Sequence, residues 1–158
     1  MKYHIQLDDT YRDEACRLLN TLVANYTIHF HRLLVYHWNL TGEHFFLLHE
    51  QFERFYRDAQ IKIDALAERI VSLGGTAGAT LGEVVEKAAL KETPKIPEAR
   101  DMMEQLARDY IALAQHMHEI IHHAEEGKDE GTVDLVGGFL AEIEKHNWMV
   151  NAWLSDQQ

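Results

Sequence analysis

Residues 43–73 contain neither proline nor glycine, and their apolar side chains recur at the three- and four-residue spacing of an amphipathic helix. Two pairs of metal-binding side chains lie along this helix: His49 with Glu53, and Asp64 with Glu68. The members of each pair are four residues apart, so each pair shares a face. Fifteen residues separate the pairs, which puts them within about 60° of the same side but roughly 22 Å apart along the axis. One metal ion, with ligand bonds of about 2 Å, cannot be held by both pairs.

A second copy of the helix removes this obstacle. If two copies run antiparallel about a two-fold axis near Asp58, the pair at 49 and 53 of one chain meets the pair at 64 and 68 of the other. The axis then creates two equivalent sites. The sequence therefore predicts a metal site shared between subunits.

His37 is placed to join the same site. Gly42 interrupts the chain between the helix that ends near His37 and the helix that carries His49. Residues just before and after such a break lie close together in an antiparallel helical hairpin. We therefore expect both imidazoles to face one point.

Helical spacing of apolar residues continues through most of the chain. A first helix is predicted from Thr10, with Asp13 three residues on as a start signal, to His37, and a second ends at Gly74 and Gly75. Residues 76–97 are expected to form a loop that carries a short helix at 83–90, with a start signal at Thr80 and Glu83. A third long helix is expected to have Pro97 in its first turn and to end near Gly127. A fourth is expected to start between Asp129 and Thr132.

Four long helices without a strand pattern predict an all-α fold. The link between the second and third long helices is much longer than the other two, which leaves room for a crossover. We therefore predict a ferritin-like four-helix bundle, with one short extra helix in that link, as a single domain spanning residues 1–158.

Charge and cysteine usage narrow the setting. The formal net charge is −11, which opposes passive binding to nucleic acid, because phosphate neutralisation by Lys and Arg supplies most of such binding. The single cysteine, Cys16, excludes an internal disulfide framework and fits a reducing cytoplasm. No apolar run approaches the length of a membrane span, and the first residues have no hydrophobic signal region.

The candidate ligands are carboxylates and imidazoles without thiolate, which suits iron, manganese or zinc. Taken singly, a histidine beside an apolar stripe is more often a packing residue, and a carboxylate on a helix is more often solvated. A ferritin-type site inside one bundle needs Glu-x-x-His on two helices, and only Glu119–His122 matches. The histidines of that helix are His116, His118, His122 and His123. His118 and His122 could chelate a divalent ion, but a solvated face is the favoured interpretation.

At this point the residues resemble a known family. The segment HWNLTGEHFFLLHEQFERFY followed by IDALAERI, with His37, His49, Asp64 and Glu68 spaced by 12, 15 and 4, is similar to the Dps family of ferritin-like mini-ferritins. The final segment EIEKHNWMVNAWL also resembles that family's last helix. The likeness covers nearly the whole chain.

The resemblance implies an activity and an assembly. It implies a hollow homo-dodecamer that oxidises Fe²⁺, with hydrogen peroxide as the usual oxidant, and stores the ferric product. His37 and His49 come from one subunit and Asp64 and Glu68 from its partner, while Glu53 replaces a carboxylate that is often Asp. Apart from the resemblance, Trp38, next to His37, is either a packing aromatic or an electron donor to an over-oxidised site. Asp129, Glu130 and Asp134 match the region that lines the family's acidic pores, although residues of this kind beside a helix junction also serve helix capping and solubility.

Other functions stay open at this stage. Some members of that family compact DNA through a basic N-terminal tail, but here the N-terminus has only Lys2 before Thr10 and the C-terminus reads LSDQQ. Strong DNA binding is therefore not expected, and a DNA-protecting structural protein is the alternative function. A third reading is a cage whose site holds zinc and oxidises little iron.

Overall fold

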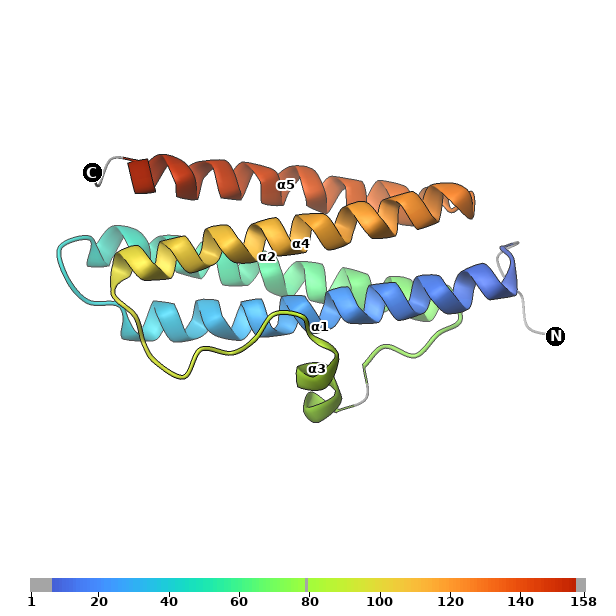
Figure 1. Ribbon diagram of the computed structural model, residues 1–158, viewed down its shortest axis with the longest axis horizontal. Helices are drawn as coiled ribbons and strands as arrows, with labels where there is room; N and C mark the ends of the chain where they lie inside the picture. The colour runs from blue at the N-terminus through green and yellow to red at the C-terminus, as the bar shows by residue number, and fades with distance from the viewer. Residues whose placement is uncertain (1–6, 79, 156–158) are drawn as a thin grey trace.

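Every regular element in the described residues, 7–78 and 80–155, of this computed structural model is a helix. The elements are α1 (Asp9–Asn39), α2 (Phe45–Ser72), α3 (Leu81–Lys87), α4 (Ala99–Glu126) and α5 (Glu130–Ser155). The four long helices form a bundle, and α3 lies outside it against α1 (Figure 1). The predicted all-α bundle with a short extra helix in the long link is confirmed.

The chain direction gives the bundle its topology. Two antiparallel hairpins, α1 with α2 and α4 with α5, pack against each other. In Figure 1, α2 and α4 both run from left to right, so the segment between them returns along the length of the molecule. That return is the crossover expected from the length of residues 73–98.

The bundle interior is apolar over most of its length. Leucines at the centre of α1, α2 and α4 are fully buried, among them Leu22, Leu66 and Leu113. Each long helix contributes one face to this core, which is why the apolar stripes were visible in the sequence. None of the helices in the described ranges is long and apolar enough to cross a membrane.

The ends of the helices differ in part from the predictions. Asp8 caps α1 by accepting a hydrogen bond from the Tyr11 amide. The predicted start at Thr10 is therefore wrong, because the helix begins before that residue. The prediction that Pro97 lies in the first turn of α4 is also wrong, because Glu98 is the N-cap and Ala99 the first helical residue. Thr80 caps α3 as predicted, but the helix covers 81–87 rather than 83–90.

The turn between α4 and α5 is fastened to the other end of the chain. Asp129 accepts hydrogen bonds from the Tyr11 hydroxyl, the Thr132 amide and hydroxyl, and the Arg69 guanidinium. Its side chain is only 3% exposed. Burial raises the pKa of Asp129, but these hydrogen bonds and the Arg69 charge lower it overall. This network around Asp129 therefore joins α1, α2 and α5 at one end of the bundle.

Two polar clusters cross the bundle interior. Asp109 of α4 accepts hydrogen bonds from His29 Nδ1 at 2.9 Å and from the Arg32 guanidinium, both of α1. Lys62 of α2 donates to Asp58 and to Glu142 of α5, each at 2.5 Å. These charged side chains pair with one another within the fold. They therefore hold helices together.

Candidate metal centre

His37 and His49 lie face to face at the junction of α1 and α2. Their ring centroids are 3.7 Å apart and their planes differ by 18°. Phe45 stacks on the outer face of this pair, 5.0 Å from His49, and Tyr56 meets His37 edge-on at 5.4 Å. The hairpin at Gly42 thus brings the two imidazoles together between aromatic rings, as the sequence predicted.

Each imidazole is held by the backbone of the other residue. His37 Nδ1 lies 2.8 Å from the carbonyl oxygen of His49, and His49 Nδ1 lies 2.9 Å from the carbonyl oxygen of His37. A carbonyl only accepts, so both Nδ1 atoms carry hydrogen and donate. In the neutral rings Nε2 then keeps its lone pair, which is the form that binds a metal ion.

The carbonyl of His37 is available because of its place in α1. It belongs to the last turn of the helix, where the backbone oxygens run out of intrahelical donors. His49 supplies the missing hydrogen bond from across the junction. The C-terminal end of α1 thereby orients the His49 imidazole. Residue spacing alone could not reveal this contact.

Glu53 follows His49 by one turn of α2. Its carboxylate accepts a hydrogen bond from Arg57 Nη2 at 2.5 Å, and its side chain is 35% exposed. The prediction that Glu53 shares a face with His49 agrees with their helical positions. The Arg57 partner could have been found from its spacing of four residues, but the sequence analysis did not consider it.

Asp64 and Glu68 lie on the same helix but on an open surface. Both are exposed, and Asp64 borders a shallow depression formed with Gln60, Ile61 and Ala67. Fifteen residues of unbroken helix keep them roughly 22 Å from His49 and Glu53. Among the described residues of one chain, no three His, Cys, Asp or Glu side chains converge as a metal site.

Comparisons with known proteins bear on the family and the fold. A family model described as ferritin-like domain matches residues 16–158. A DNA protection during starvation protein of Brevibacillus brevis is 39% identical over 87% of this chain and 92% of its own length. The crystal structure of a Dps protein from Vibrio cholerae O1, described as a ferritin-like diiron-carboxylate protein, aligns with a TM-score of 0.92 and 36% identity over 98% of both chains.

The chain belongs to the Dps family. A general stress protein 20U of Bacillus subtilis is also similar, with 37% identity over 90% of this chain and 98% of its own length. The resemblance inferred from the histidine and carboxylate spacing is thereby confirmed at the level of family and fold.

The histidines of α4 do not add to the centre of this Dps-family chain. His116 contacts Asn25, and His123 stacks on Tyr11 with 4.9 Å between centroids. His118 and Glu119 are exposed. The Glu119–His122 match therefore faces away from the bundle interior, where a ferritin-type site would have to lie. His122 instead approaches Glu126 of its own helix at 3.5 Å.

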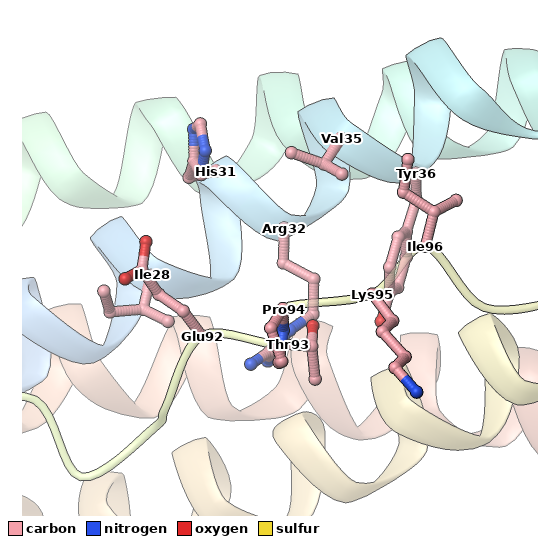
Figure 2. Close-up of a pocket in the computed structure, with 10 residues that line it drawn as sticks. All are labelled: Ile28, His31, Arg32, Val35, Tyr36, Glu92, Thr93, Pro94, Lys95 and Ile96. Carbon is pink, nitrogen blue, oxygen red and sulfur yellow. The ribbon is translucent and has the colours of Figure 1, made fainter.

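A pocket elsewhere in the fold lies between α1 and residues 92–96 (Figure 2). Figure 2 shows Arg32 extending from α1 toward this loop. Its guanidinium is already bound to Asp109 and to the Lys91 carbonyl. None of the predicted ligands lines the pocket, so it is separate from the centre at His37 and His49.

The remaining predicted residues are placed as follows. Trp38 is 62% exposed beside His37. Glu130 and Asp134 are exposed in the first turns of α5. Asp129 is buried in its network within the single chain and occupies the N-cap position of α5. The pore role of Asp129, Glu130 and Asp134 stays a prediction.

Proposed function

We propose that this protein is a ferroxidase and iron store whose catalytic site is completed by a second subunit. The observation that carries the proposal is the reciprocal bonding of His37 and His49, which leaves Nε2 of each of the two stacked imidazoles with its lone pair. Glu53 follows His49 by one helical turn. Two imidazoles and one carboxylate make an incomplete site. Asp64 and Glu68 supply the missing ligand types, but one helix holds them too far away.

A two-fold axis near Asp58 completes the set. Antiparallel packing of α2 on its copy sets Glu53 opposite Asp64 of the partner subunit. The exposed surface around Asp64 is suited to such packing, since Ile61 and Val71 of α2 are 67% and 60% exposed. Each pair of chains then has two sites, and each site draws on both chains.

The ligand set matches the chemistry of iron oxidation. Carboxylates stabilise Fe³⁺ through their charge, so the site accepts Fe²⁺ and favours its oxidised form. Two Fe²⁺ ions give one electron each to hydrogen peroxide, whose oxygen–oxygen bond breaks to form water. Because both electrons are used together, no hydroxyl radical is released. Ferric oxyhydroxide forms with loss of protons and is stored in the cavity of a homo-dodecamer.

Entry and protection extend this proposal. Glu130 and Asp134 guide Fe²⁺ through acidic pores, since negative side chains raise the local concentration of cations. Trp38, next to His37 in sequence, donates an electron when a site is over-oxidised. Both roles depend on the assembled cage.

The shared site is tested with the double variant Asp64→Ala/Glu68→Ala. Fe²⁺ is added without oxygen, hydrogen peroxide follows, and the product is separated by size with iron detection. We expect ferric iron to co-elute with the wild-type cage, and oxidation in the variant to be at least about 100-fold slower, because loss of only an outer-shell partner of a metal ligand already costs about 10- to 100-fold. If both proteins oxidise iron alike, surface nucleation explains the reaction and the proposal fails.

DNA protection without iron oxidation is the alternative function, suggested by the name of the Brevibacillus brevis relative. The net charge of −11 opposes it. Lys2 and residues 156–158 lie outside the described residues, so the structure does not bear on the tails. We expect no retardation of plasmid DNA in a gel-shift assay at low salt and neutral pH. A retarded band would favour the alternative.

A further inference from the structure

The ion pair between Glu53 and Arg57 occupies one of the proposed iron ligands. Arg57 Nη2 lies 2.5 Å from Glu53 Oε1. A second pair with the same spacing, Glu50 and Arg54, lies 2.6 Å apart on the same helix. The two pairs differ in burial, because the Glu53 side chain is 35% exposed and that of Glu50 is 65% exposed. Only the first pair involves a residue of the centre.

Arg57 also lies on the metal-binding face of α2. At about 100° per residue, position 57 is within about 40° of Glu53 and about 20° of Asp64. Two other basic residues of α2 bind different acids. Lys62 donates hydrogen bonds to Asp58 and Glu142, and Arg69 donates one to Asp129. Arg57 is therefore the guanidinium nearest to the carboxylates that the two-fold axis brings together.

Repulsion between carboxylates explains why a cation is useful at the proposed site before a metal ion binds. Glu53 of one chain and the acidic pair of the other place three carboxylates in a small space, and like charges at that range repel. An arginine side chain keeps its proton in proteins, so the Arg57 guanidinium is a permanent positive charge beside Glu53. It can neutralise Glu53 until a metal ion arrives.

We propose that Arg57 is a positioning residue that holds the Glu53 carboxylate away from the metal until a divalent cation displaces it. This inference rests on the proposed function. The metal position that depends on Glu53 is then the weaker of two, because an ion pair must break before it fills. Arg57 thus sets the order in which the two positions fill and the Fe²⁺ concentration at which both are occupied.

The test is an anaerobic titration with Co²⁺, a redox-stable substitute for Fe²⁺, followed by visible absorbance and calorimetry. The proteins are the wild-type cage, Arg57→Gln, Arg57→Lys and the matched control Arg54→Gln. We expect the weaker binding step of Arg57→Gln to tighten about twofold, which corresponds to the strength of an exposed ion pair between residues four apart on a helix. Arg57→Lys is expected to fall between the two, and high salt to shrink the difference.

The control separates local displacement from general charge. Arg54→Gln removes the same charge from the same helix, so it should bind Co²⁺ like wild type. Equal tightening in both variants, or none in Arg57→Gln, overturns the role of Arg57. If Asp64→Ala/Glu68→Ala binds Co²⁺ as the wild type does, the proposed function itself is overturned. If that double variant loses Co²⁺ binding but Arg57→Gln binds Co²⁺ as the wild type does, only this inference is overturned.

Discussion

Two variants that are each inactive are expected to regain ferroxidase activity when their subunits are mixed. His37→Ala/His49→Ala removes the imidazole half of the site, and Asp64→Ala/Glu68→Ala removes the acidic half. If each site takes one half from each of two chains, random mixing of equal amounts restores about a quarter of the wild-type sites. Activity is measured as peroxide-dependent Fe²⁺ oxidation after the variants are co-expressed or co-refolded.

A site inside one chain predicts the opposite result. No subunit in the mixture would then contain all of its ligands, and activity would stay at the level of the separate variants. The control is to mix the two assembled variants without refolding, because subunits are not expected to exchange between intact cages. A recovery that appears only after refolding would therefore assign the effect to the shared interface.

The fold was predictable because its determinants are local. The apolar stripes of the long helices, the break at Gly42 and the stop at Gly74 are all set by neighbours in the chain. The length of the link after α2 was enough to indicate the crossover. The errors occur at helix ends: Asp8 rather than Thr10 caps α1, α4 begins after Glu98 and so excludes Pro97, and α3 covers 81–87 rather than 83–90.

The candidate site was predictable only in part. Helical spacing placed Glu53 on the face of His49 and put Asp64 too far along the same helix to share a metal ion with His49 in one chain. The exchange of hydrogen bonds between His37 and His49 depends on backbone atoms of two helices, and spacing carries no information about it. Burial of Asp129 likewise depends on Tyr11, which is more than a hundred residues away in sequence.

Asp109→Asn is expected to be the most destabilising of the simple substitutions in the bundle interior. Asp109 is fully buried and binds His29 Nδ1 and the Arg32 guanidinium, whose side chains are 2% and 4% exposed. Removing the carboxylate charge leaves Arg32 buried without compensation, which costs about 3–5 kcal/mol of unfolding free energy. Urea unfolding at fixed protein concentration measures the loss, since assembly also contributes to apparent stability.

The pH dependence of this loss is set by the sign of the pKa shift. Burial raises the pKa of Asp109, but the His29 hydrogen bond and the charges of His29 and Arg32 lower it below the usual 3.8. A carboxyl with a lowered pKa stabilises the fold above its unfolded pKa and loses that contribution as pH falls through the folded value. The difference between wild type and Asp109→Asn should therefore be constant near neutral pH and shrink only below about pH 4.

An exposed acid on the same helix provides the comparison. Glu104 pairs with Arg100 at 3.2 Å on the surface of α4, so Glu104→Gln should change the unfolding free energy by less than about 0.5 kcal/mol. If Asp109→Asn is equally mild, the charge of Asp109 does not hold α1 to α4. A large loss that persists unchanged below pH 4 would instead assign the effect to packing, because a protonated Asp109 would then still stabilise the fold.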